Sequence, residues 1–503
     1  MPDTNATDTN AVDASERTQA AVVAYLSTLS DTAPITTHLS RVFLLPDRVL
    51  KLKRARTLPF VDYEALATRE HFCRHEVEVN RRFAPALYSA ARPVTREGDR
   101  LSLDGPGEVV DWVVDMKRFD GDSQFDTMVE RGTLDGDMVD ALAVRIAALH
   151  REAPVARLTD QAERVAELCR QLHDDLAPQL ASEADRAALG RWRAAAETAL
   201  ARQRDELGRR ARHGFVRRCH ADLHLSNICL WQGEPTPFDA IEFDEDMATI
   251  DVLYDVAFVL IDLAHRGRRD LSMRLLSRYL EATRDYRGLA VLPLFMANRL
   301  MVRALVGAIK GRDPRPYLDE ALAAIARPPA PHLVAIGGRS GTGKTTIARA
   351  LAPTLNAVVI RTDAVRKELT DAGVGAHLPA SAYVLAQRAA VYRRMLVDAR
   401  RAIRAGWPVI LDGTFLEPEW REAVGEAAAA WGVAFSGIWL EAGTETLAAR
   451  VTARTNDLSD ADAAVVRAQA DAEIGPMRWS RVDASGSAER VAMRAEAALG
   501  ETG

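Results

Sequence analysis

The stretch HLVAIGGRSGTGKTTIARALA, residues 332–352, decides the fold of the last third of the chain. The apolar residues 332–338 predict a buried strand, and residues 346–352 predict the helix that follows it. Between them, residues 338–345 fit the pattern G-x-x-x-x-G-K-[ST] in full. Farther along, the short apolar runs AVVI, VILDG and SGIWLE alternate with helical stretches. This alternation predicts an α/β domain with a parallel sheet and crossover helices.

The residue types in this loop suit the binding of phosphate groups. Glycines allow backbone N–H groups to close around phosphates, and the following helix directs its positive end at them. Lys344 adds a positive charge of catalytic value, and the Thr345 hydroxyl can hold magnesium. We therefore expect ATP and Mg²⁺ as cofactors of this segment. The predicted nucleotide-binding residues are Gly338, Arg339, Ser340, Gly341, Thr342, Gly343, Lys344, Thr345 and Thr346.

Polar side chains follow two other predicted strands of the segment. Asp363 comes just after the run AVVI, with Arg366 one turn into the next helix, and Asp412 ends the run VILD. In open α/β sheets, ligands bind at the carboxyl ends of strands. Asp363 and Arg366 are therefore candidate catalytic residues, and Asp412 is a candidate magnesium ligand. The alternatives are a helix N-cap for Asp363 and a turn residue before Gly413 for Asp412.

With these motifs, residues 332–503 resemble the small P-loop kinases of the AAA family, a group with gluconate kinases, chloramphenicol phosphotransferase and zeta-toxin-like kinases. The resemblance implies that Asp363 and Arg366 bind or deprotonate the hydroxyl of the phosphate acceptor. It also implies a helical lid whose arginines reach the phosphates, and Arg450 and Arg454 occupy that place in the sequence. The alternative for the two lid arginines is a solvated basic helix face.

A second motif, HADLHLSN at residues 220–227, lies in a predicted strand-loop-strand unit. An aspartate five residues before an asparagine, in a loop that leaves a strand, is the layout of a kinase catalytic loop. In that layout Asp222 accepts the proton of the acceptor hydroxyl, and Asn227 holds magnesium. The alternative is a polar turn in which Asp222 caps a helix.

This second motif resembles the H-G-D-x-x-x-x-N loop of aminoglycoside phosphotransferases and choline kinases, with Ala221 in place of the usual glycine. The resemblance extends over residues 30–325 and implies an α+β, bilobal, protein-kinase-like fold. In the family, a metal-binding acid follows the loop. Glu242 is the candidate when the alignment starts from the later sequence DVLYDVA, whereas Asp239 and Asp244 fit equally well when it starts from Asn227.

The same resemblance assigns residues upstream of the loop. Lys51 suits the strand lysine that binds phosphates, with Lys53 on the same face of the strand as the alternative. Glu76 suits its ion-pair partner in a long helix, and Met116 begins the segment expected to line the adenine slot. A surface lysine and an unrelated helix-face glutamate are the alternative for this pair. No glycine precedes Gly98, so the glycine-rich loop that covers phosphates in such kinases is missing.

Length and composition limit the protein class. The chain has 503 residues, 48% of them hydrophobic, and a formal net charge of -6. Two to four domains follow at about 100–200 residues each, and the charge argues against general nucleic-acid binding. The four cysteines lack zinc or CxxC spacing, as is typical of reduced thiols. The polar N-terminus is unlike a signal peptide, and no apolar run is long enough for a membrane span, so we expect a cytoplasmic protein without a membrane partner.

The proline-rich run RPPAP at residues 327–331 gives the clearest boundary, because prolines stop helices and stiffen linkers. We predict a disordered tail over 1–18, a kinase-like domain over 19–326 and a P-loop kinase domain over 332–503. The function expected is an ATP-dependent phosphotransferase (a kinase with an alcohol group as acceptor) acting on a small hydroxylated molecule at two nucleotide sites. Two alternatives stay open, namely that the first domain is a pseudokinase or nucleotide sensor regulating the second, or that the chain is a toxin-like kinase or ATPase.

Overall fold

A computed structural model of the chain describes residues 19–58, 61–326, 330–370, 385–452, 466, 467, 469 and 473–500. The predicted tail and residues 327–329 of the predicted linker lie outside these described residues. The chain divides into two compact units. The first contains Met1–Leu158 and Ala211–Val259, and the second contains Thr159–Arg210 and Leu260–Gly503.

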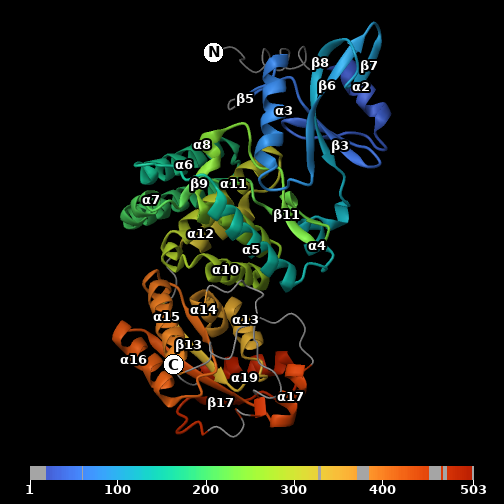
Figure 1. Ribbon diagram of the computed structural model, residues 1–503. Helices are drawn as coiled ribbons and strands as arrows, with labels where there is room; N and C mark the ends of the chain where they lie inside the picture. The colour runs from blue at the N-terminus through green and yellow to red at the C-terminus, as the bar shows by residue number, and fades with distance from the viewer. Residues whose placement is uncertain are drawn as a thin grey trace. The chain divides into compact units, whose positions relative to one another are not determined.

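The first unit combines a large antiparallel sheet with small hairpins and helices (Figure 1). Its strands are β1 (Ile35–Thr36), β2 (Ser40–Leu44), β3 (Arg48–Lys53), β4 (Thr57–Leu58), β5 (Val61–Asp62), β6 (Tyr88–Glu97), β7 (Arg100–Leu103), β8 (Glu108–Lys117), β9 (Val216–Arg218), β10 (Ile228–Trp231), β11 (Glu234–Pro237) and β12 (Thr249–Asp251). Its helices are α2 (Ala20–Leu29), α3 (Leu66–Asn80), η1 (Gly121–Ser123), α4 (Phe125–Glu130), α5 (Gly136–Glu152), η3 (Leu225–Asn227) and α8 (Glu245–Ala248). Two further helices, α7 (Glu183–Arg212) and α9 (Val252–His265), contribute residues to both units.

The large sheet has the strand order β1-β2-β3-β8-β6-β7 and separates two apolar clusters. Helix α3 packs on one face, where Val49 lies in a cluster with Cys73 and Val77. Helix α2 packs on the other face, where Leu50 and Leu52 lie in a second cluster. Because successive side chains of a strand point to opposite faces, the lysines of β3 point to the α3 face, as the alternation in the sequence predicts.

The second unit contains a helical part and a parallel sheet with its own helices. The helices are α6 (Gln161–Leu176), η2 (Ala177–Gln179), α10 (Arg269–Thr283), η4 (Tyr286–Ala290), α11 (Leu292–Ile309), α12 (Arg315–Ile325), α13 (Lys344–Leu355), α14 (Thr362–Leu369), α15 (Leu385–Arg404), α16 (Pro418–Trp431), α17 (Thr444–Thr452) and α19 (Ala488–Gly500). The strands are β13 (His332–Gly338), β14 (Val358–Arg361), β15 (Val409–Asp412), β16 (Ala434–Glu441) and β17 (Ser480–Asp483).

The parallel sheet has the order β14-β15-β13-β16-β17, with every pair of neighbours parallel. Strand β13 is central, and its Ile336 lies beside Asp412 of β15, which in turn lies beside Arg361 of β14. The predicted parallel α/β fold of this segment is confirmed. The carboxyl ends of these three neighbouring strands therefore lie at the same end of the sheet, next to the loop that follows β13.

The helical part and the parallel sheet belong to one compact unit, although the predicted boundary at 327–331 lies between them in sequence. Helix α10 contacts α13 and β14, and α15 contacts η4. Among the described helices, α11 has the length and apolar composition of a membrane span, but half of it is buried inside the protein, as in a core helix.

Candidate active sites

The loop between β9 and β10 in the first unit has a backbone held by an aspartate of α9. Asp255 accepts hydrogen bonds from the backbone N–H groups of His220 at 3.1 Å and Ala221 at 2.8 Å. Ala221 has a φ of 71°, and this left-handed conformation costs a residue with a Cβ about 1–2 kcal/mol. The family glycine would adopt it freely, so the Asp255 carboxylate supplies hydrogen bonds that fix the turn despite the alanine.

Asp222 and Asn227, the two predicted functional residues of the loop, lie in contact. The side-chain N–H of Asn227 donates to Asp222 Oδ2 at 2.9 Å and to the Asp222 carbonyl at 3.0 Å. His224 Nε2 lies 3.4 Å from Asp222 Oδ2. The Asp222 side chain is 39% exposed, so a substrate hydroxyl can reach this carboxylate.

A cluster of lysines and acids faces α3 in the same unit. Lys51 Nζ lies 2.9 Å from Glu76 Oε1 and 2.5 Å from Asp239 Oδ1. Lys53 Nζ lies 2.7 Å from Glu76 Oε2 and also contacts Glu242 Oε1. Both candidate lysines thus contact Glu76. The expected ion pair with Glu76 therefore does not distinguish Lys51 from Lys53.

Charge and burial act against each other in this cluster. Burial alone would raise the pKa of Glu76, but the two lysines lower it to about 2. Burial opposes the charged form of Lys51 and Lys53, yet the neighbouring carboxylates hold the pKa of each lysine well above its usual range. Burial raises the pKa of Glu242, with Lys53 opposing the shift. The lysines therefore stay protonated at neutral pH.

The three acids considered as metal ligands have different surroundings. Glu242, the candidate chosen from the sequence, is buried against Lys53. Asp244 caps α8, because its Oδ1 accepts from the backbone N–H of Met247 at 2.9 Å. Asp239 is 41% exposed and has a φ of 60°. Of the three carboxylates, that of Asp239 is the one that is both accessible and next to Lys51.

Met116, the residue predicted to begin the adenine slot, is buried in β8. It pairs with Val49 of β3 and lies in the apolar cluster that includes Phe238. Its side chain therefore contributes to the α3 face of the sheet, on the side where Lys51 and Glu76 meet. Its contact with a nucleotide base stays a prediction.

In the second unit, the loop between β13 and α13 brings a hydroxyl and a carboxylate together. Thr345 Oγ1 donates to Asp412 Oδ2 at 2.6 Å, and Lys344 Nζ donates to the Arg339 carbonyl at 3.0 Å. Asp412 is buried, and burial raises its pKa, while Lys344, Thr345 and Arg361 oppose the rise. Both oxygen donors have the chemistry that Mg²⁺ prefers, so the residues present fit the predicted metal.

The loop approaches α17 closely through a glycine. A Cβ built on Gly341 would lie 2.7 Å from the Leu447 carbonyl oxygen and 3.1 Å from the Leu447 Cα. Gly341 also has a φ of 86°. The backbone conformation and the close approach of α17 both require glycine at this position.

Asp363 and Arg366 form an ion pair at the start of α14. Arg366 Nη1 lies 2.7 Å from Asp363 Oδ1, and the Asp363 side chain is 34% exposed. The N-cap position of α14 is Arg361 rather than Asp363, so the capping alternative for Asp363 is not what the structure shows. Because β14 and β15 pair in register through Arg361 and Asp412, Asp363 follows the strand end next to the predicted metal ligand.

The predicted lid residues have different outcomes. Arg454 lies outside the described residues. Arg450 lies in α17 and donates to the carbonyls of Ala484 at 3.0 Å and Gly486 at 3.2 Å. Its guanidinium is therefore bound to the segment after β17, and a contact with phosphate stays a prediction. Thr346, in the first turn of α13, is exposed.

Sequence reasoning did not include three residues that contact this site. Gln469 Oε1 accepts from the backbone N–H of Ser340 at 2.8 Å. The Tyr392 hydroxyl accepts from the backbone N–H of Phe415 at 2.9 Å, and Arg361 ends β14 next to Asp412. Gln469 and Tyr392 lie far in sequence from the residues that they contact, and Arg361 lies beside Asp412 only through strand pairing, so no short spacing pattern predicts these contacts.

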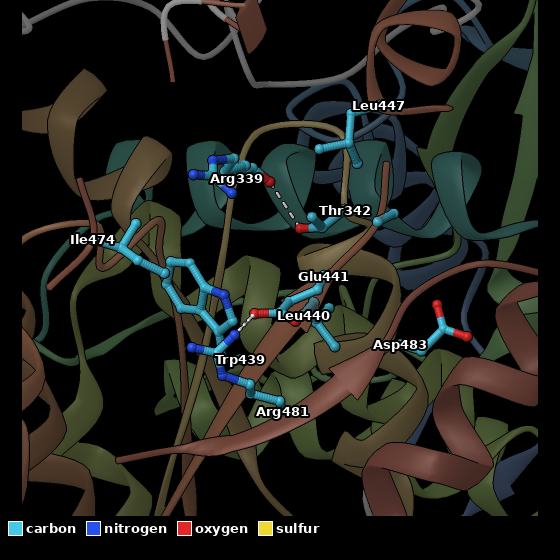
Figure 2. A pocket seen from close by; sticks show the side chains of 10 residues that line it. Arg339, Thr342, Trp439, Leu440, Glu441, Leu447, Ile474, Arg481 and Asp483 are labelled. Atoms are coloured by element: carbon cyan, nitrogen blue, oxygen red, sulfur yellow. Dashed lines mark hydrogen bonds and ion pairs between the residues drawn. The ribbon is translucent and has the colours of Figure 1, made fainter. Parts of the chain in front are cut away.

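A cavity of about 670 Å³ lies beside the same loop, on the side of β16 and β17 (Figure 2). Arg339 and Thr342 line it from the loop, and the ion pair between Arg481 and Glu441, 2.8 Å long, lines it from the strands. Asp363 and Arg366 follow β14, at the opposite edge of the sheet. The cavity is therefore separate from the candidate acceptor residues.

Comparison with known proteins adds families to these geometries. Residues 42–292 match the phosphotransferase enzyme family, and residues 333–473 match an AAA domain. A choline kinase from Cryptosporidium parvum Iowa II is 11% identical, covers 60% of this chain and 93% of its own, and has a TM-score of 0.38. A gluconokinase from Sinorhizobium meliloti 1021 is 20% identical, covers 34% of this chain and 93% of its own, and has a TM-score of 0.26.

A relative matches both parts of the chain at once. The uncharacterized protein Rv2004c of Mycobacterium tuberculosis (strain ATCC 25618 / H37Rv) is 31% identical over 476 residues, which cover 90% of this chain and 92% of the relative. The matched families and the two sheets show that residues 42–292 have a kinase-like α+β fold and that residues 333–473 have a P-loop kinase fold. The chain therefore belongs to the family of this mycobacterial protein, and in this chain a phosphotransferase-family domain precedes an AAA-type P-loop domain.

Proposed function

We propose that the chain is an ATP-dependent phosphotransferase that transfers a phosphoryl group to a hydroxyl of a small molecule, and that it has two nucleotide sites. The observation that carries the proposal is the hydrogen bond between Thr345 and Asp412 beside Lys344. The pair of Asp363 and Arg366 follows the strand next to it. The proposed phosphate-binding and acceptor-binding groups follow neighbouring strands at the carboxyl end of one sheet, which supports the proposal.

The residues of the P-loop site divide the work of transfer. The backbone N–H groups of residues 338–345 and the start of α13 bind phosphate oxygens, and Lys344 adds its charge. Thr345 and Asp412 would hold magnesium, which supplies positive charge against the phosphates when bound. Asp363 accepts the proton of the acceptor hydroxyl, whose oxygen then bonds to the terminal phosphorus as the bond to the ADP oxygen breaks. Arg366 keeps the Asp363 carboxylate in place.

The first unit supports a second site of the same reaction class. Asp222 would take the proton of an acceptor hydroxyl, and Asn227 would hold the metal through its amide oxygen. For the second metal ligand we choose Asp239 over Glu242, because Asp239 is accessible and Glu242 is buried against Lys53. Lys51 is the phosphate-binding lysine of this proposal, since it is the lysine that reaches Asp239.

The test of the P-loop site uses the full chain carrying Asp222→Asn, which silences the first site. A panel of sugars, sugar acids and amino alcohols is screened for acceptor-dependent ADP release. Asp363→Asn should then lower kcat about 10²–10⁴-fold, the range for loss of a general base, with little change in the Kd of ATP. An equal loss of ATP affinity, or an unchanged kcat, would contradict the role given to Asp363.

Asp319→Asn is the matched control for this test. Asp319 pairs with Arg315 at 2.9 Å on α12, so the change removes a helical aspartate–arginine pair of similar geometry outside both sites. Its kcat should equal that of the parent chain. A comparable loss in the control would show that the effect of Asp363→Asn is not specific to the site.

A further inference from the structure

Helix α10 of the helical part contacts the parallel sheet through buried polar groups. The Ser277 hydroxyl accepts from the backbone N–H of Val359, in β14, at 3.1 Å. The indole N–H of Trp407 donates to the Leu289 carbonyl, in η4, at 2.9 Å. We call this contact region the α10 seam, defined by Ser277, Glu281 and Leu289 with their partners. Helix α10 also contacts α13.

Glu281 is the charged centre of the α10 seam. Its carboxylate accepts from Arg361 Nε at 2.8 Å and from Arg278 Nη1 at 2.7 Å. The side chains of Glu281 and Arg361 are 5% and 6% exposed. Burial opposes the charge of Arg361, but Glu281 outweighs it and raises the pKa of the guanidinium. Burial likewise opposes the charge of Glu281, and the two arginines lower its pKa. The pair is thus charged and enclosed.

Arg361, the partner of Glu281, lies at the carboxyl end of β14, next to the candidate P-loop site. Arg361 is the last residue of β14, lies beside Asp412 in the strand pairing and immediately precedes α14. Asp363 is the second residue of α14. A side chain that fixes Arg361 therefore fixes the strand end beside Asp412, from which the chain enters α14 and reaches Asp363 two residues later.

We propose that Glu281 is a positioning residue for the P-loop site, which holds Arg361 and through it the acceptor-side residue Asp363. The inference rests on the function proposed above. It assigns part of the P-loop site to a helix that belongs, by sequence, to the phosphotransferase-family half of the chain. Through the α10 seam, the geometry of the P-loop site depends on the phosphotransferase-family half of the chain, even when no nucleotide is bound to that half.

The size of the effect follows from how strongly transfer depends on geometry. A misplacement of about 1 Å at an acceptor-side group can cost on the order of 100-fold in rate. On the nucleotide side of the site, Lys344 donates to the Arg339 carbonyl and Thr345 donates to Asp412, and neither partner is a residue of α10. Loss of Glu281 should therefore lower kcat and leave the KM of ATP nearly unchanged.

The test compares full chains in the Asp222→Asn background. The first readout is acceptor-dependent ADP release from Mg·ATP, measured with the acceptor panel. Glu281→Gln should lower kcat about 10- to 100-fold and change the KM of ATP less than about threefold. The second readout is amide hydrogen exchange of peptides from Val358–Leu369, which should become faster in the same variant. Glu281→Asp, which keeps the charge and shortens the side chain, should show both changes to a smaller degree.

Glu206→Gln is the matched control, because Glu206 is also buried in the helical part and pairs with Arg209 and Arg287. It should leave turnover and the exchange of Val358–Leu369 unchanged. Unchanged exchange of this segment in Glu281→Gln would overturn the proposal, as would a rise in the KM of ATP that matches the loss of kcat. If Lys344→Ala left turnover unchanged, the proposed function would fail, while the exchange measurement would still decide the role of Glu281.

Discussion

Asp412 shows how single residues set the chemistry of the P-loop site. Burial raises the pKa of its carboxyl group, whereas the charge of Lys344 and the hydrogen bond from Thr345 favour the ionised form. A carboxylate binds a metal ion in its ionised form. Lys344 and Thr345 thus oppose the rise that burial causes, so the ionisation of Asp412 depends on the P-loop residues around it.

Two glycines of the loop give a stability prediction at this scale. Gly341 and Gly343 both have positive φ, 86° and 88°, but only the Cβ position of Gly341 meets the backbone of Leu447. Both alanine variants should lose about 1–2 kcal/mol from backbone strain, and Gly341→Ala should lose more because neighbouring backbone must move. Thermal denaturation without nucleotide measures this, and equal melting temperatures for the two variants would contradict the close approach of α17.

At the scale of elements, β3 and α3 are joined by charge as well as by apolar packing. Val49 packs with Cys73 and Val77, and Lys51 and Lys53 reach Glu76 on the same face. The alternation along β3 could be predicted from the sequence, because a period of two is visible in six residues. The contact between Lys53 and Glu242 could not be predicted from the sequence, because the two residues are 189 positions apart in the chain.

This joint between β3 and α3 predicts a pH dependence. The pKa of Glu76 falls from 4.5 to about 2 on folding. A lowered carboxyl pKa contributes stability that is present above about pH 4.5 and is lost as the pH falls toward 2. Lys51→Met leaves Lys53 as one partner but raises the pKa of Glu76. The free energy of unfolding should therefore fall less between pH 5 and pH 3 in this variant than in the parent chain.

Urea unfolding at the two pH values measures this difference. Lys117→Met, which removes an exposed lysine from the neighbouring strand β8, is the control and should keep the pH dependence of the parent. If Lys51→Met and the parent lost equal stability between pH 5 and pH 3, Lys51 would not be responsible for the low pKa of Glu76.

At the scale of the whole molecule, the compact units do not follow the order of the motifs. The second unit takes helices from before the predicted linker and the entire parallel sheet after it. Proline composition marks residues 327–331 as a break in secondary structure, but it carries no information on which helix face covers which strand. The contact of α10 with β14 depends on Ser277 and Glu281, which look like ordinary polar helix residues in the sequence.

This arrangement predicts that the P-loop part is less stable without α10. A fragment starting at residue 331 loses the Glu281–Arg361 ion pair and the hydrogen bond between Ser277 and Val359, and it exposes the surface of α13 and β14 that α10 contacts. Its melting temperature should be roughly 10 °C below that of a fragment starting at residue 260, which keeps α10. Differential scanning calorimetry of the two fragments measures this, and equal melting temperatures would mean that the α10 seam adds no stability.

The sequence predicted the two motif loops and the fold of each part, because both loops are short, local patterns with fixed spacing. It predicted less well which side chains complete the sites. The acid next to Lys51 and the carbonyls that bind Arg450 come from segments distant in sequence, which only the folded chain brings together. For the metal ligand, Asp239, Glu242 and Asp244 lie within six residues and fit the spacing equally well. Burial against Lys53 and capping of α8 separate them only in three dimensions.

The central claim, that the chain has two phosphotransfer sites, is tested most directly by ATP turnover in four full-length proteins. These are the parent, Lys344→Ala, Asp222→Asn and the double variant, each measured with Mg·ATP and every acceptor of the panel. We predict that each single variant loses part of the turnover and that the double variant loses all of it. Turnover that disappears in Lys344→Ala alone and is unaffected by Asp222→Asn would contradict a second catalytic site and leave the first half with a regulatory role.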